Sequence, residues 1–229
     1  MNEKVSIIIP VYNDTEILLE TLSRLQYARK DGHEIIVVDG GSRDFPGERI
    51  AELTDKFVQS RKGRSIQMNS GAEYATGDLF VFLHADTWLP GIHEFIPVIR
   101  AHTEKAHDAW GFFRVRLSGT GILFRLIETG MNLRSRFTHI ATGDQAIIVT
   151  RELFERVSGY EEIPLMEDIA LCKKLGVITK PLCLDATVQS SSRRWEQQGV
   201  IKTILQMWCY RIAYFMGMKP EQLVKHYYG

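Results

Sequence analysis

Three runs of apolar residues, each ending in polar side chains, constrain the fold of this chain more than any other feature. They are VSIII (5–9), which we expect to end at Pro10, EIIVVD (34–39) and DLFVFLHAD (78–86). Unbroken rather than alternating apolar runs are typical of strands buried on both faces. Helix-like segments separate them, so the pattern predicts βαβ units and an α/β fold with a mainly parallel central sheet flanked by helices.

Polar residues follow these strands where a parallel sheet binds its ligands. Tyr12 and Asn13 follow the first strand, Asp39 ends the second and Asp86 ends the strand at 78–86. Ligands of open α/β sheets bind outside the carboxyl ends of the strands. We therefore expect a binding site at this edge.

The second half of the chain has a different pattern. We expect a mixed-sheet strand at 109–117, a helix at 120–136, a short strand at 143–150 and a helix at 166–175. No linker rich in Pro, Gly or Ser separates the halves. The sequence predicts one domain over 1–198, with halves at 1–90 and 91–198, and a C-terminal helical appendage over 199–229.

Composition excludes some classes of function. The 28 basic and 28 acidic residues among 229 cancel, which argues against a nucleic-acid partner bound by bulk positive charge. Cys172, Cys183 and Cys209 form no CxxC pair, so a reducing compartment is expected. With no secretory leader and no apolar run of spanning length, the expected location is cytoplasmic.

The segment 199–218, GVIKTILQMWCYRIAYFMGM, is dense in large apolar and aromatic residues. Lys202 and Arg211 fall on opposite sides of a helix of 3.6 residues per turn, so the helix has no clean polar face. Two interpretations stay open. The helix packs against the domain or a second subunit in a homodimer, or it makes peripheral contact with the inner face of a membrane.

Seven segments together resemble family-2 glycosyltransferases with the nucleotide-diphospho-sugar (GT-A) fold, hexosyltransferase-like enzymes. In the family's order they are SIIIPVYND (6–14), IIVVDGGSRD (35–44), GRSIQMNSGAEYATGD (63–78), FLHADT (82–87), GDQAIIV (143–149), MEDIALCKKL (166–175) and SSRRWEQQG (191–199). The likeness covers about 200 residues. It is greatest to a compact bacterial subgroup with LHADT in place of the DxD motif.

The resemblance implies a nucleotide-sugar donor, a UDP-sugar by default, held by the half at 1–90. Asp39 then accepts a hydrogen bond from base or ribose, or else it only caps the Gly40–Gly41 turn. Arg64 contacts phosphate or belongs to a solvated basic turn. The other donor-binding residues that the resemblance implies are Pro10, Val11, Tyr12 and Asn69, with Gln67 nearby.

The resemblance also implies a divalent cation, Mn²⁺ or Mg²⁺, that neutralises the leaving diphosphate. Side chains two apart on a strand point the same way, and here His84 stands where the first acid of DxD would be. Asp86 remains as the direct ligand, and one carboxylate with substrate phosphates can hold such an ion. His84 tolerates Mn²⁺ as a ligand, hydrogen-bonds the ribose, or is a satisfied core histidine.

Glu167 and Asp168 match the family's ED motif, in which the aspartate is the general base for the acceptor hydroxyl. The alternative is that both acids only favour a helix N-terminus. Asp144 binds the acceptor or belongs to a turn. Arg194 and Trp195 match the RW part of QxxRW, with Ser191 in place of the glutamine; Arg194 pairs with diphosphate, while Trp195 stacks on a sugar, closes a lid or anchors the C-terminal helix.

The predicted function is an inverting, metal-assisted transfer of a sugar to an acceptor hydroxyl, the acceptor being lipid-linked or a soluble small molecule. The alternative is a non-catalytic nucleotide-sugar-binding or scaffolding protein on the same fold, favoured by the missing acid at position 84. A dinucleotide enzyme needs a GxGxxG turn after the first strand, and IPVYND (9–14) contains no glycine.

Overall fold

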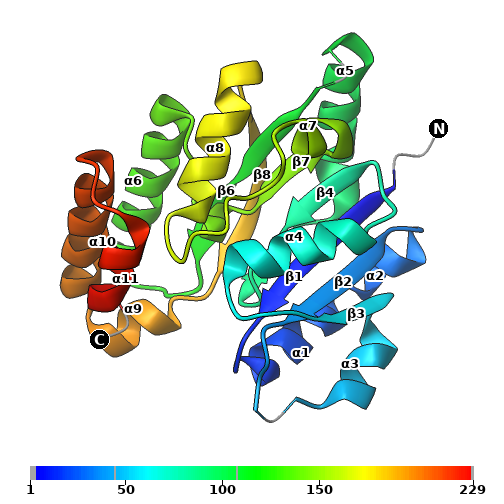
Figure 1. Cartoon of the computed structure of the whole chain (residues 1–229), viewed down its shortest axis with the longest axis horizontal. Helices are drawn as coiled ribbons and strands as arrows, with labels where there is room; N and C mark the ends of the chain where they lie inside the picture. The colour runs from blue at the N-terminus through cyan, green and yellow to red at the C-terminus, as the bar shows by residue number, and fades with distance from the viewer. Residues whose placement is uncertain (1–3, 44, 107, 228–229) are drawn as a thin grey trace.

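The structure is a computed structural model that describes residues 4–43, 45–106 and 108–227. Its strands form one eight-stranded sheet in the order β3-β2-β1-β4-β7-β6-β8-β5 (Figure 1). The strands are β1 (Val5–Val11), β2 (Glu34–Asp39), β3 (Lys56–Gln59), β4 (Leu79–Phe82), β5 (Thr87–Trp88), β6 (Trp110–Leu117), β7 (Ile147–Thr150) and β8 (Leu182–Ser190).

Strand direction changes at the middle of this sheet. β1 pairs in parallel with β2 and β4, and β2 pairs in parallel with β3. β7 then runs antiparallel to both β4 and β6, while β6 and β8 are parallel. The N-terminal half is thus the parallel sheet that the apolar runs predict, and the second half is mixed, as expected from 109–117.

Helices cover both faces of the sheet (Figure 1). They are α1 (Thr15–Arg24), α2 (Gln26–Lys30), α3 (Gly47–Leu53), α4 (Arg64–Tyr74), α5 (Ile96–Ala106), α6 (Ile122–Thr138), α7 (Arg151–Arg156), α8 (Glu167–Ile178), α9 (Arg193–Gln198), α10 (Val200–Phe215) and α11 (Pro220–Tyr227), with short 3-10 helices η1 (Ile92–Glu94) and η2 (Gly143–Gln145).

The two faces explain why the strand runs are unbroken. Successive side chains of a strand point to opposite faces. Ile7 packs into a core cluster with residues of α1, α2, α3 and α5, whereas Ile8 packs into a second cluster with residues of α4, α7 and α8. Both residues are fully buried. A polar residue at either position would lie in an apolar layer.

Two local expectations were wrong. β1 does not end at Pro10 but continues to Val11, with Pro10 paired to Val38 of β2. β4 pairs only with Val5–Ile8, so the missing amide hydrogen of Pro10 costs no ladder bond on that side. In addition, the predicted strand at 143–150 begins only at Ile147, because 143–145 form η2.

Glu34 fixes the amino-terminal ends of β1, β2 and β4. Its carboxylate accepts hydrogen bonds from Ser6 Oγ, from Thr76 N and Oγ1 and from Gly77 N, and pairs with Lys4 Nζ at 3.0 Å. Burial by itself raises the pKa of Glu34, but these hydrogen bonds lower it to about 2. The charged form therefore stabilises the fold by on the order of 3 kcal/mol.

Replacing Glu34 by Gln should lower the free energy of unfolding at neutral pH by about that amount. Because the folded-state pKa lies below the unfolded-state value, the stabilisation is complete above about pH 5 and is lost as the pH falls toward 2. Urea unfolding across this range measures the difference, with exposed Glu73→Gln as the matched control. An unchanged difference at low pH would contradict the assignment.

The segment expected to form the C-terminal helical appendage contains two helices, α10 and α11, and α9 comes just before it. Val200, Ile204 and Met207 of α10 pack against Phe124 and Ile127 of α6, with Leu117 and Trp195 in the same cluster. Within the described residues, no helix is both long and apolar enough to cross a bilayer.

Candidate active site

The carboxyl ends of β1, β2 and β4 meet at one edge of the sheet, as the sequence predicts. Val11 and Asp39 are paired at the ends of β1 and β2, and the amide of Leu83, just after β4, donates to Ile8 O at 3.0 Å. The segment from His84 to Asp86 therefore begins at this edge. This edge is the base of the candidate site.

Asp39 lies 1% exposed beneath the turn that follows β2. Its carboxylate accepts hydrogen bonds from the amides of Gly41 and Ser42, at 3.0–3.1 Å, and from Ser42 Oγ at 2.5 Å. The alternative turn-capping role is therefore realised. A contact of Asp39 with a ribose or base remains a prediction.

Among the residues expected to hold a base, Tyr12 is the exposed one. Pro10 and Val11 are buried strand residues, whereas Tyr12 is 37% exposed and has Lys62 Nζ 4.0 Å from its ring centre. An exposed aromatic face with a cation nearby suits stacking on a base. Pro10 and Val11 can form only the floor beneath it.

Two amide side chains of α4 hold the loops of the site. Gln67 Nε2 donates at 2.8 Å to both Val11 O and Val38 O, which joins the ends of β1 and β2. Asn69 uses both ends of its amide on the backbone of Tyr160, with two bonds of 2.9 Å. Asn69, expected to face the nucleotide, thus supports the loop before α8.

His84 and Asp144 approach each other from opposite halves of the chain. His84 Nδ1 lies 3.7 Å from Asp144 Oδ1, and His84 Nε2 is buried with no hydrogen-bond partner among the described residues. Burial lowers the pKa of His84, but Asp144 and Asp86 outweigh it, and the net shift is upward. Asp144 and Asp86 thus stabilise the protonated form of the His84 imidazole.

Asp86 is held at the end of the same segment. Its carbonyl accepts a bond from the amide of Ser191 at 3.0 Å, and the carbonyl of Ala85 accepts one from Thr21 Oγ1 at 2.6 Å. Burial raises the pKa of Asp86; His84 opposes this rise, while Asp144 and Asp14 add to it. Asp86 thus lies under the influence of two other carboxylates and of His84.

Glu167 and Asp168 form the first turn of α8, and only Glu167 is fully buried. Arg64 Nη1 lies 3.5 Å from Glu167 Oε1. Burial raises the pKa of Glu167, Asp168 raises it further, and Arg64 opposes the shift. Asp168 Oδ2 accepts a hydrogen bond of 2.6 Å from the amide of Gly143.

The loop of η2 therefore joins the two predicted parts of the site. Gly143 contacts Asp168, and the next residue, Asp144, faces His84. A Cβ atom on Gly143 would lie 2.0 Å from His84 Nε2, so only glycine fits between the histidine and the loop. The structure thus brings Asp86, His84, Asp144 and Asp168 to one place.

Comparison with known proteins assigns a family to this arrangement. The family model described as glycosyl transferase family 2 matches residues 6–155. The chain belongs to glycosyltransferase family 2. The matched segment begins within β1, includes the His84–Asp86 segment and the η2 loop, and ends within α7, before the Glu167–Asp168 pair.

Curated relatives of this family-2 glycosyltransferase are longer proteins. A probable glycosyltransferase of Bacillus subtilis, YdaM, is 29% identical over 190 residues, 73% of this chain and 45% of that protein. The dolichol-phosphate mannosyltransferase of Pyrococcus furiosus is 39% identical over 139 residues, 52% of this chain and 40% of that protein. The chain spans less than half the length of both.

Solved structures share the fold at low identity, which confirms the α/β, GT-A-like prediction. The mannosyltransferase PcManGT of Pyrobaculum calidifontis, in complex with GDP-Man and Mn²⁺, superposes with a TM-score of 0.63 at 18% identity, over 83% of this chain and 57% of that one. S. aureus TarS 1–349 in complex with UDP-GlcNAc gives 0.63 at 20%, over 82% and 58%.

The donor atoms near Asp86 fit the divalent cation implied for a family-2 glycosyltransferase. Asp86 and Asp144 offer carboxylate oxygens, which Mg²⁺ and Mn²⁺ prefer, whereas the Nε2 of His84 is closed off by Gly143 and its Nδ1 lies beside Asp144. Within the described residues, no group of three or more His, Cys, Asp or Glu side chains has complete metal-site geometry. The remaining ligands would have to come from substrate.

Of the roles left open for Trp195, the structure fits the anchoring of the C-terminal helices. Trp195 is 6% exposed and packs with Leu117 and Phe124, so it anchors the C-terminal helices rather than facing a sugar. The side chain of Arg194 lies outside the part of the chain that the structure describes. Its expected pairing with diphosphate stays a prediction.

Two arginines near the site were missed by sequence reasoning. Burial lowers the pKa of Arg134, on α6, to about 10, with the charge of Arg211, on α10, acting in the same direction and those of Asp144 and Asp168 opposing it. Arg211 is likewise under the influence of Asp168. No motif marks either residue, because only the packing of α10 beside α6 brings them to the loop of η2.

Proposed function

We propose that this chain transfers a sugar from a nucleotide-diphosphate donor to an acceptor hydroxyl, with inversion at the anomeric carbon. The observation that carries the proposal is the meeting of Asp86, His84, Asp144 and Asp168 through the η2 loop. It supplies a donor-side carboxylate and an acceptor-side carboxylate within one site. Single displacement needs both.

On the donor side, Tyr12 would stack on the base and Arg64 would face the diphosphate. Asp86, with Asp144 and His84 beside it, would hold Mn²⁺ or Mg²⁺; the bound cation would neutralise charge on the leaving diphosphate. UDP-sugars are the default donors. Because one fold neighbour was solved with GDP-Man and another with UDP-GlcNAc, any test should include both GDP-sugars and UDP-sugars.

On the acceptor side, Asp168 would take the proton of the acceptor hydroxyl. The hydroxyl oxygen then bonds to the anomeric carbon on the face opposite the diphosphate, while the bond from that carbon to the diphosphate oxygen breaks. The pair of electrons and the negative charge leave with the nucleotide. Gly143, by donating to Asp168 Oδ2, would keep the other carboxylate oxygen directed at the acceptor.

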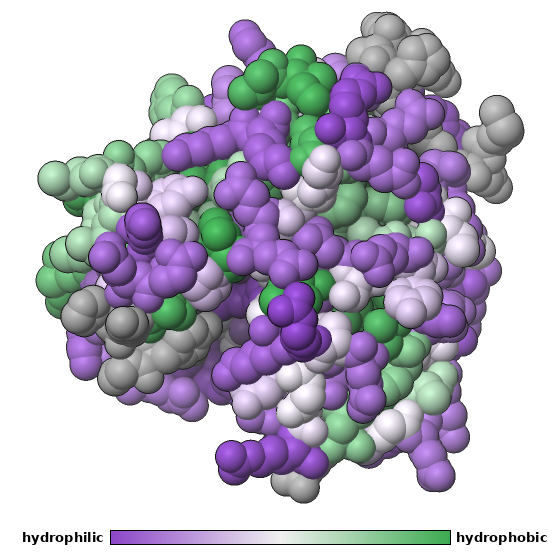
Figure 2. Space-filling model, viewed as in Figure 1, coloured by the Kyte–Doolittle hydropathy of each residue, from purple (hydrophilic) through white to green (hydrophobic). Residues whose placement is uncertain are grey.

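We further propose a lipid-linked acceptor. Two of the relatives are named as acting with dolichol phosphate and undecaprenyl phosphate. α10 also exposes an apolar stripe at helical spacing: Ile201, Leu205, Trp208, Ile212 and Phe215. Figure 2 shows apolar residues along the left edge, where Figure 1 places α10.

A bilayer surface or a second copy of the chain would cover this stripe. Light scattering of the free protein and flotation with vesicles separate the two. A dimer that a Trp208→Gln variant disrupts favours the second copy, whereas vesicle binding by a monomer favours the bilayer.

The deciding experiment is nucleotide release from UDP-, GDP- and dTDP-sugars with Mn²⁺, with Mg²⁺ and with EDTA. We expect metal-dependent release from one donor class in the presence of a lipid-linked acceptor. Metal-independent release would leave the transferase assignment standing but transfer the role of the cation to His84, Arg64 or Arg194. Donor binding without turnover on any acceptor would favour the non-catalytic alternative.

A further inference from the structure

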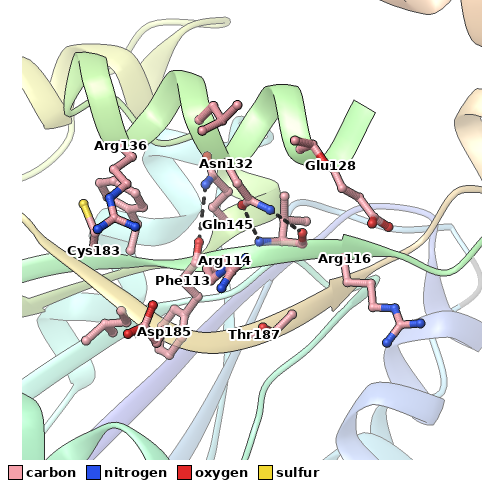
Figure 3. A pocket seen from close by; sticks show the side chains of 15 residues that line it. Phe113, Arg114, Arg116, Glu128, Asn132, Arg136, Gln145, Cys183, Asp185 and Thr187 are labelled. Atoms are coloured by element: carbon pink, nitrogen blue, oxygen red, sulfur yellow. Dashed lines mark hydrogen bonds between the residues drawn. The ribbon is translucent and has the colours of Figure 1, made fainter. Parts of the chain in front are cut away.

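A groove of about 330 Å³ lies between α6 and the β6–β8 part of the sheet, apart from the carboxylates of the active site (Figure 3). Its lining includes Arg114 and Arg116 from β6, Arg136 and Asn132 from α6, and Cys183 and Asp185 from β8. It shares with the catalytic loop only Gln145, the residue after Asp144.

The groove lies where β7 no longer pairs with β6 and where the register between β6 and β8 shifts. β7 pairs with β6 only as far as Phe112, and beyond it Asn132 of α6 bonds both the amide and the carbonyl of Val115, at 2.9 and 3.0 Å. The register of β6 with β8 shifts between Phe113 and Arg114. Along this part of β6, α6 therefore takes the place that β7 has beside Trp110–Phe112.

Most polar groups of the groove are already used by the fold. Asn132 bonds the Val115 backbone and Gln145 donates to Phe113 O, as Figure 3 shows, and Gln145 Oε1 also accepts from Ser135 Oγ. Glu128 pairs with Arg125 Nη1 at 3.0 Å and accepts from the amide of Leu117. Its charge is therefore compensated within the fold.

The three arginines are the exception. Arg114, Arg116 and Arg136 are exposed, and among the described residues none of them takes part in an ion pair or a side-chain hydrogen bond. Asp185 lines the same groove and balances one of these charges in number. Since Glu128 is already paired with Arg125, the lining keeps a net positive charge.

We propose that this groove binds the phosphate group of a lipid headgroup or of a free phosphorylated compound. Guanidinium groups bind phosphate oxygens in bidentate fashion, and an anion on two uncompensated arginines gains charge-assisted hydrogen bonds. Next to the groove, α6 exposes Leu133 and Phe137, which are 50% and 80% exposed and would suit an apolar tail. The inference is independent of the chemistry proposed above.

Cys183 provides a local reporter for this site. It is exposed and lines the groove, and the charge of Arg136 acts on its thiol. Cys209 is also exposed but lies on α10, and Cys172 is buried. The rate of alkylation at Cys183, resolved by peptide mass spectrometry with Cys209 as internal reference, reports occupancy of the groove alone.

We expect one of two probes, glycerol 3-phosphate or vesicles of phosphatidylcholine containing phosphatidylglycerol, to slow alkylation of Cys183. Cys209 should stay unchanged with glycerol 3-phosphate; with vesicles the reference is plain phosphatidylcholine, because Cys209 lies on α10, the proposed bilayer contact. EDTA is present throughout, so that metal-dependent binding at Asp86 does not contribute. Protection by glycerol 3-phosphate identifies a soluble phosphate compound; protection by anionic vesicles alone identifies a lipid headgroup. Plain phosphatidylcholine vesicles control for non-specific adsorption.

The double variant Arg114→Gln/Arg116→Gln should weaken the protecting probe about tenfold or more. Both side chains are exposed, so its thermal midpoint should match that of the control variant Arg49→Gln, which removes an exposed arginine on α3. If neither probe protects Cys183, or if the double variant is protected as well as the wild type, the phosphate site is wrong. Protection of Cys183 and Cys209 alike by glycerol 3-phosphate would also overturn it.

Discussion

Asp168→Asn should reduce sugar transfer by about a hundredfold or more while leaving donor affinity nearly unchanged. An amide cannot take the proton of the acceptor hydroxyl at neutral pH. Its oxygen can still accept the hydrogen bond that the amide of Gly143 now donates to Oδ2 at 2.6 Å, so the η2 loop should keep its position. Single-turnover transfer and equilibrium donor binding, measured on the same preparation, separate the two effects.

Two further variants make this result interpretable. Asp31→Asn alters an exposed aspartate beyond α2 and should behave as the wild type. Glu167→Gln tests the other member of the pair, which is buried against Arg64 and is therefore expected to change stability more than chemistry. Loss of turnover in Glu167→Gln alone would assign the base to Glu167.

Near-normal turnover in Asp168→Asn would have a specific meaning. A phosphate acceptor is largely ionised at neutral pH and needs no general base, whereas a hydroxyl acceptor does. That outcome would therefore exclude the hydroxyl acceptor proposed above. It would leave family membership untouched, since this rests on residues 6–155.

The N-terminal half of the fold was predictable because its signals are local. Ile7 and Ile8 face opposite core clusters, so two consecutive apolar residues are enough to indicate that both faces of the strand are buried. The polar residues Tyr12, Asp39 and Asp86 could be placed at one edge because the ends of parallel strands must meet there. The prediction that β1 ends at Pro10 was wrong because it depends on how far β4 pairs along β1, and the sequence of β1 does not show this.

The long-range parts of the site could not be predicted. Nothing near Asn69 signals that its amide serves Tyr160, 91 residues away. Trp195 fits equally well, from sequence, in a sugar site and in the cluster around Phe124 that it actually joins. The strand β8 alternates exposed and buried residues too irregularly to be recognised, because its bulge against β6 interrupts the pattern.

Asp86→Asn is the second change for which we expect a large effect. Burial raises the pKa of Asp86, and the charges of Asp144 and Asp14 raise it further, while His84 opposes them. A divalent cation would relieve that repulsion and join the carboxylate to the donor diphosphate. The variant should lower donor affinity in Mn²⁺ by about a hundredfold and make it insensitive to EDTA.

His84→Asp tests the same site from the opposite direction. The new carboxylate would lie close to Asp144, whose Oδ1 is now 3.7 Å from His84 Nδ1, and two residues before Asp86. Without a cation the added charge should lower the thermal midpoint; with Mn²⁺ the midpoint should rise by more than in the wild type, because a ligand that binds only the folded state stabilises it. This readout does not depend on catalysis. If Mn²⁺ shifts the midpoint of wild type, Asp86→Asn and His84→Asp equally, no cation binds at Asp86, and the donor diphosphate must be neutralised by side chains such as Arg64.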